Sequence, residues 1–230
     1  MIENNNTYKK YFNYDKIFIA KHDNVIFPSR IYNKITSQIK GDVLDIGTGD
    51  GYKLKIILDG SPKTKIKSIT ALDPSPLVKQ AEEMLCSYNV CIRQNDWLDF
   101  VKNNKAKYDV ILCFEVLEHL ERPDLFLEEI VKLLKPEGIF ISSTPNRPVY
   151  RLSCYVLNEK PDPTHVSEMN LFQVKQLMKH FFSYIEYLGF FPYLKAYQKF
   201  TWFNIIDRFF PFLRWTRTIY CFAKLNVSLR

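Results

Sequence analysis

Short apolar runs rich in β-branched residues alternate with helical patterns over the first two thirds of the chain. Strand, helix and strand in this order require parallel pairing through right-handed crossovers, with helices on both faces of one sheet. In the run at 109–114, the residues after Asp109 are apolar without alternation, as expected where both faces of a strand are buried. The pattern therefore predicts a doubly wound α/β fold. Strands are expected at residues 42–46, 66–72, 90–93, 108–114 and 138–143, and helices at 52–58, 76–88 and 123–134.

The regular alternation of strands and helices ends after Thr144. Residues 145–164 contain four prolines, which are excluded from a central strand and from a helix interior, so an active-site loop or small cap is expected at about 145–168. A helix at 169–181 follows, and then an extended pair at 184–193 and 219–225. An aromatic segment at about 198–216 separates the two strands of this pair.

Three of the seven glycines fall in one loop, directly after the first predicted strand. Gly47 and Gly49 let the backbone turn tightly and approach a ligand, and Gly51 permits close packing where the next helix starts. The loop therefore predicts a ligand site at the carboxyl end of this strand. A dinucleotide fingerprint would need a glycine where Tyr52 stands, which argues against a nicotinamide cofactor.

Acidic residues lie at or just beyond the ends of the first three predicted strands. Asp45 suits a cationic amino-acid head such as the ammonium group of S-adenosylmethionine (SAM), and Asp73 can accept hydrogen bonds from both hydroxyls of a ribose. Asp96 could accept the amino group of adenine while Trp97 stacks on the ring. An N-capping acid beside a packed aromatic is the structural alternative for this last pair.

At these residues the chain resembles the class I SAM-dependent methyltransferases. Residues 45–51, Asp-Ile-Gly-Thr-Gly-Asp-Gly, match the first motif of that family, and Asp73 and Asp96 match its ribose-side and adenine-side acids. Residues 114–120 and 134–138 match the segments after the fourth strand and before the fifth. The chain is most similar to the ubiquinone-biosynthesis type O-methyltransferases, which share a Glu-Val-Leu-Glu-His segment and a strand ending in Ser-Thr-Pro-Asn.

The resemblance implies a Rossmann-like, mostly parallel seven-stranded sheet and methyl transfer from SAM to an acceptor, with a hydroxyl of a small molecule, lipid or sugar expected. It implies an N-terminal segment, 1–33, that covers the SAM site, and a methyltransferase domain at 34–230. Arg30 matches a basic residue over the SAM carboxylate, although a surface arginine is the alternative. The expected SAM-binding residues are Arg30, Asp45, Gly47, Thr48, Gly49, Gly51, Asp73, Asp96, Trp97 and Phe114.

Two carboxylates and two histidines form a second constellation. Glu115, Glu118 and His119 lie just beyond the fourth strand, and His165 lies in the proline-rich cap. His119 could be a general base that takes a proton from the acceptor hydroxyl. Alternatively, all four residues could bind Mg²⁺ or Mn²⁺, which would orient and acidify that hydroxyl. A purely structural role, capping a short helix and packing the cap, is the third interpretation, and spacing alone leaves all three open.

The metal interpretation has its own family parallel. Small-RNA 2′-O-methyltransferases carry a similar Glu-x-x-Glu-His set plus a downstream histidine, and they bind a metal with it. A metal-dependent RNA 2′-O-methyltransferase is therefore an alternative function. A nicotinamide-dependent oxidoreductase and a catalytically silent SAM-binding protein are alternatives from other classes.

Net charge and cysteine content limit the possible binding partners and the cellular location. The net charge of +7 suits an anionic cofactor, an acidic lipid surface or nucleic acid, and equally plain solubility. The aromatic and basic segment 200–215 is expected to pack over the sheet, to make a lipid-substrate lid or peripheral membrane contact, or, less favoured, to bind nucleic acid. Five cysteines without a CxxC spacing predict a reduced, cytoplasmic location. The absence of a long apolar run predicts a protein that is neither secreted nor transmembrane.

Overall fold

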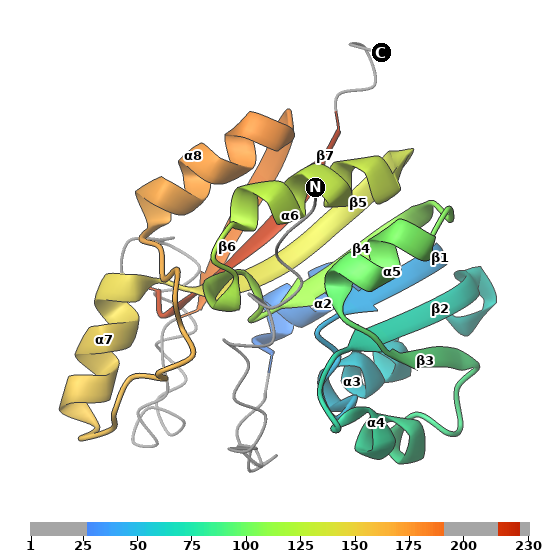
Figure 1. Cartoon of the computed structure of the whole chain (residues 1–230), viewed down its shortest axis with the longest axis horizontal. Coiled ribbons are helices and arrows are strands. Elements are labelled where there is room, and N and C mark those ends of the chain that lie inside the picture. The colour runs from blue at the N-terminus through green and yellow to red at the C-terminus, as the bar shows by residue number, and fades with distance from the viewer. Residues whose placement is uncertain (1–26, 191–215, 226–230) are drawn as a thin grey trace, which may run out of the picture.

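The computed structural model describes residues 27–190 and 216–225, so the predicted aromatic segment lies outside the described residues except for Thr216. Seven strands of the described chain form one sheet in the order β3-β2-β1-β4-β5-β7-β6 (Figure 1). β1 to β5 pair in parallel, and β7 runs antiparallel to both of its neighbours. The doubly wound, mostly parallel α/β fold is confirmed. The strands are β1 (Gly41–Ile46), β2 (Ile66–Asp73), β3 (Val90–Gln94), β4 (Tyr108–Phe114), β5 (Leu134–Pro145), β6 (Tyr184–Phe190) and β7 (Thr218–Lys224).

Helices cover both faces of the sheet, which explains the unbroken apolar runs of its central strands. Helices α2, α3 and α4 pack on the face that carries Phe222, whereas α5, α6 and α8 pack on the face that carries Phe140. Both phenylalanines are fully buried. The α-helices are α2 (Ser29–Gln38), α3 (Tyr52–Gly60), α4 (Val78–Met84), α5 (Trp97–Asn103), α6 (Pro123–Leu133), α7 (Arg147–Val156) and α8 (Leu171–Phe181), and the short 3-10 helices are η2 (Lys63–Lys65) and η3 (Leu117–His119).

Local sequence signals set where several helices begin. α6 starts with Pro123 in its first turn, where a missing N–H costs no helical hydrogen bond. α8 starts with a capping box in which Asn170 and Gln173 each accept the other's backbone N–H. α6 and α8 both pack on the face of the sheet that carries Phe140.

The proline-rich segment contains a helix that the sequence pattern does not predict. Residues 145–164, expected to form a loop or small cap, contain the ten-residue helix α7, and Pro145 is the last residue of β5, paired with Thr218. Pro148 lies in the first turn of α7, a position that tolerates proline, so it does not interrupt the helix. α7 and the loop after it extend beyond the carboxyl ends of the strands (Figure 1).

Other boundaries also differ from the pattern. The helix expected at 76–88 is limited to α4, and α2 and α5 were not expected. α2 runs through residue 33, where the N-terminal segment was expected to meet the domain, and that division stays a prediction. All five cysteines are free thiols. Within the described ranges, no helix has the length and apolar character that crossing a membrane requires.

Candidate active site

The strand order reverses between β1 and β4, and ligands of open α/β sheets bind at the carboxyl ends of the strands beside such a switch point. The glycine loop, residues 47–51, leaves β1 here, and the segment 115–119 leaves β4. The two segments touch, because a Cβ added to Gly47 would lie 2.4 Å from Cγ2 of Val116. The fold therefore brings the two predicted constellations together.

The glycine loop depends on backbone angles that side chains disfavour. Gly47, Gly49 and Gly51 have φ of +77°, +57° and +82°. A Cβ on Gly49 would meet no atom within 4 Å, so the backbone there faces open space, whereas one on Gly51 would lie 3.1 Å from Ala81 of α4. The N–H groups of Gly47 and Thr48 both donate to the carbonyl of Leu72 and fix the loop against β2. The loop thus offers an open, rigid backbone surface.

Two buried carboxylates flank this loop. Asp73 at the end of β2 accepts the N–H of Gly49 at Oδ2 and the N–H of Ser75 at Oδ1, both at 2.8 Å. Asp45 of β1 is buried, and this burial raises its pKa to about 6. Asp73 therefore anchors the loop, and the contacts of both carboxylates with SAM stay predictions.

Asp96 and Trp97 take up the arrangement named as their structural alternative. Oδ1 of Asp96 accepts the N–H of Leu98 at 2.9 Å and caps α5. Trp97 is buried, with its ring centroid 4.6 Å from that of Phe126. Binding of adenine by this pair stays a prediction.

The two remaining predicted SAM contacts are Phe114 and Arg30. Phe114 is the last residue of β4 and is buried, with its ring edge-on to Phe27 at 5.8 Å. Arg30 is exposed in the first turn of α2. Neither position tests the predicted contact with SAM.

Glu115 turns the chain sharply at the end of β4. Its φ of +58° is unusual for a residue with a side chain and stores strain of the kind found at functional sites. Its N–H donates to the carbonyl of Ser143 at 3.0 Å, and its Oε1 accepts the Ser143 hydroxyl at 2.6 Å. These bonds hold Glu115 against β5 and direct the chain into η3.

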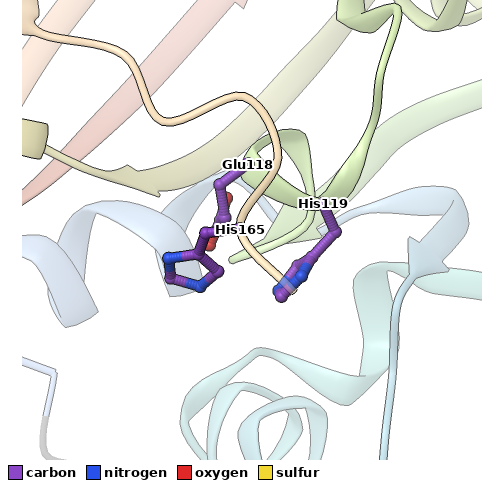
Figure 2. Close-up of side chains that lie close together, drawn as sticks. All are labelled: Glu118, His119 and His165. Carbon is purple, nitrogen blue, oxygen red and sulfur yellow. The ribbon is translucent and has the colours of Figure 1, made fainter. Parts of the chain in front are cut away.

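Glu118, His119 and His165 converge, each offering one ligand atom within 4.8 Å of the others (Figure 2). Glu118 is fully buried; its Oε2 accepts the hydroxyl of Thr144 at 3.0 Å, and its Oε1 has no hydrogen-bond partner among the described residues. Burial, with the nearby charge of Glu115, raises the pKa of Glu118 well above its ordinary value. Glu115 itself is not part of the converging group.

Both imidazole rings are oriented through Nδ1. Nδ1 of His119 lies 3.0 Å from the hydroxyl and 3.3 Å from the carbonyl oxygen of Thr164. Nδ1 of His165 lies 3.1 Å from Oε1 of Glu168. The rings of His119 and His165 pack edge to face, with their centroids 4.8 Å apart. Burial, together with neighbouring His165, lowers the pKa of His119 below its ordinary value of 6.5, so its ring is neutral at neutral pH. A neutral imidazole suits both a metal ligand and a general base.

The loop 162–168 holds this cluster together. The N–H of Ser167 donates to the carbonyl of Glu118 at 3.0 Å, and its hydroxyl donates to the carbonyl of Leu117 at 2.9 Å. Asp162 accepts the N–H of Thr164 at 2.8 Å, closing a turn. These supporting residues were not predicted from the sequence, although an aspartate two positions before Thr164 is a turn signal.

A family model for a methyltransferase domain matches residues 23–181. The chain belongs to this methyltransferase family. The chain is 36% identical over 141 residues to a ubiquinone biosynthesis O-methyltransferase of Actinobacillus pleuropneumoniae serotype 5b, a match that covers 55% of this chain and 57% of the relative. It thus spans little more than half the length of such curated relatives. The predicted family resemblance is confirmed.

Solved methyltransferases share the fold. The small RNA methyltransferase HEN1 superposes with a TM-score of 0.63 at 21% identity, covering 86% of this chain and 25% of that chain. The N-methyltransferase NodS from Bradyrhizobium japonicum WM9, in complex with S-adenosylhomocysteine, superposes with a TM-score of 0.59 at 14% identity, covering 89% of this chain and 90% of that one. At these identities the likeness establishes the Rossmann-like methyltransferase fold.

Proposed function

We propose that the chain transfers the methyl group of SAM to a hydroxyl group of a small-molecule, lipid or sugar acceptor. The observation that carries this proposal is the contact between Gly47 and Val116, which joins the glycine loop of a methyltransferase domain to a cluster of carboxylate and imidazole groups. The matched relatives named O-methyltransferases support an oxygen acceptor. Family membership disfavours the nicotinamide-dependent alternative.

The residues around the glycine loop fit SAM, whose sulfonium supplies an electrophilic methyl group when it is bound. The open side of Gly49 admits a ligand close to the backbone. Asp45 and Asp73 place negative charge where a cationic amino-acid head and ribose hydroxyls would be recognised. The loop's rigid attachment to β2 holds the ligand in one orientation, and such orientation contributes up to about 7–11 kcal/mol in favourable systems.

The cluster at η3 fits a divalent cation. Glu118 offers a buried oxygen that has no partner among the described side chains, and the Nδ1 contacts of His119 and His165 make Nε2 the nitrogen suited to a metal. A bound Mg²⁺ or Mn²⁺ would lower the pKa of the acceptor hydroxyl. Glu115 stays the predicted fourth ligand. In the alternative, neutral His119 accepts the proton of the hydroxyl itself.

Transfer of a labelled methyl group to a fractionated lysate tests the proposal. Label is expected in the small-molecule or lipid fraction; label in RNA would favour the RNA 2′-O-methyltransferase alternative, and no label with intact SAM binding would favour a silent SAM-binding protein. Chelation with EDTA should abolish transfer, and Mn²⁺ or Mg²⁺ should restore it. Full activity in chelator would refute the metal, and a loss confined to His119→Ala would then support the base.

The aromatic segment at 198–216 is proposed to bring the enzyme to a membrane surface or to cover an apolar acceptor. Its support is the interleaving of aromatic side chains with Arg208 and Arg214, together with the net charge of +7. A cytoplasmic location is proposed on the free thiols of all five cysteines.

A further inference from the structure

A chain of polar contacts leads from the surface of α7 into the candidate metal cluster. The side chain of Arg151 is exposed, and its Nε donates to Oε2 of Glu168 at 2.7 Å. The Glu168 side chain is only 3% exposed, and its second oxygen, Oε1, lies 3.1 Å from Nδ1 of His165. Both oxygens of this buried carboxylate are therefore engaged, one by a guanidinium and the other by an imidazole.

We propose that Glu168 is a positioning residue that holds His165 in the Nδ1–H tautomer. A carboxylate only accepts hydrogen bonds, so the ring nitrogen that faces it must carry the proton. Nε2 of His165 then presents a lone pair to the cluster with Glu118 and His119. Carboxylates that orient metal-binding histidines in this way raise the basicity of the ligand and fix its ring. The consequence for metal affinity rests on the function proposed above.

Arg151 supports this role because its contact with Glu168 holds the carboxylate in place. The guanidinium donates to Oε2 and fixes the position of the buried carboxylate, so that Oε1 stays directed at His165. His119 depends on a different group, because Thr164 contacts its Nδ1. Different groups thus contact the two Nδ1 atoms, so the tautomer of His119 serves as a control for the tautomer of His165.

The tautomer is measured directly by long-range ¹H–¹⁵N NMR of the histidine side chains, at a pH well above the ordinary imidazole pKa of about 6.5. In the wild-type protein without metal, His165 is expected in the Nδ1–H form. In Glu168→Met, which removes the acceptor at similar length, the Nε2–H form should gain population while His119 stays unchanged. Wild-type His165 in the Nε2–H form, or an unchanged tautomer in Glu168→Met, would overturn the inference. The wild-type spectrum needs no variant, so it decides the point even if Glu168→Met does not fold.

Mn²⁺ binding, followed by electron paramagnetic resonance, tests the consequence for metal affinity. Glu168→Met should weaken binding about ten- to a hundredfold, and Arg151→Met should weaken it less, because the carboxylate remains. Glu186→Gln removes the carboxylate of a different ion pair, with Lys34, and should leave binding unchanged. Equal affinity in wild type and Glu168→Met would refute the positioning role. Failure of the wild type to bind Mn²⁺ would refute the metal part of the proposed function, whereas the tautomer result would still decide the role of Glu168.

Discussion

Alanine substitution at Gly47 should destabilise the protein more than the same change at Gly49. Both residues have left-handed φ, which costs an L-residue about 1–2 kcal/mol. At Gly47 the new Cβ would also lie 2.4 Å from Cγ2 of Val116, whereas at Gly49 it would meet nothing within 4 Å. Overpacking of this kind costs about 1–3 kcal/mol. Gly47→Ala should therefore lower the free energy of unfolding by about 2–5 kcal/mol, and Gly49→Ala by about 1–2 kcal/mol.

Urea denaturation of the two variants measures this difference, with Val116→Ala completing a double-mutant cycle. Removal of the Val116 methyl groups relieves the clash, so the Gly47→Ala and Val116→Ala double variant should be more stable than the sum of the single changes predicts, by about 1–3 kcal/mol. Gly49→Ala should instead weaken SAM binding, because its Cβ fills the open side of the loop. Equal destabilisation at both glycines, or strict additivity in the cycle, would refute the contact between Gly47 and Val116.

Three further results are expected. Asp73→Ala should weaken SAM binding about ten- to a hundredfold in calorimetry, since it removes charge-assisted hydrogen bonds of roughly 1.5–3 kcal/mol; unchanged affinity in a folded variant would place the ribose elsewhere. Because burial raises the pKa of Asp45 from 3.8 to about 6, the folded state binds its proton more tightly than the unfolded state. The protonated carboxyl therefore stabilises the fold below about pH 4, and about 3 kcal/mol of this stability is lost as the pH rises to about 6. Asp45→Asn should remove this pH dependence from denaturation curves measured across the range. A variant whose stability varies with pH in parallel with wild type would contradict the raised pKa of Asp45. Vesicles of anionic lipid should sediment the protein at low salt, and its complete recovery in the supernatant would exclude the membrane role of the aromatic segment.

The architecture could be predicted from sequence because its signals are local. Strand β4 is apolar from Val110 to Phe114 since both its faces are covered, and the glycines of residues 47–51 report backbone angles that other residues avoid. These patterns locate the glycine loop and a ligand site at the carboxyl end of the first strand without any knowledge of tertiary contacts. α7 was missed because the meaning of a proline depends on whether it stands at the end or in the interior of an element.

The residues that hold the Glu118, His119 and His165 cluster in place could not be predicted, because they act through contacts between segments that are distant in the sequence. Thr164 reaches His119 across 45 residues, and Ser167 reaches the carbonyl of Leu117 across 50. Such pairs carry no periodicity and require the path of the loop after α7 to be known. Glu168 follows His165 by three positions, but its burial and its pairing with Arg151 become visible only in the folded chain.

The position of β7 has a consequence for synthesis of the chain. β7 lies between β5 and β6, yet residues 218–224 follow both of those strands in sequence. While the ribosome translates the residues between β6 and β7, one edge of β5 presents a row of unpaired backbone groups, and β6 has no strand with which to pair. Unpaired strand edges of this kind pair readily with other chains. The nascent chain is therefore most prone to aggregate after β6 has emerged and before β7 has, and the sheet closes only when β7 inserts between its two neighbours.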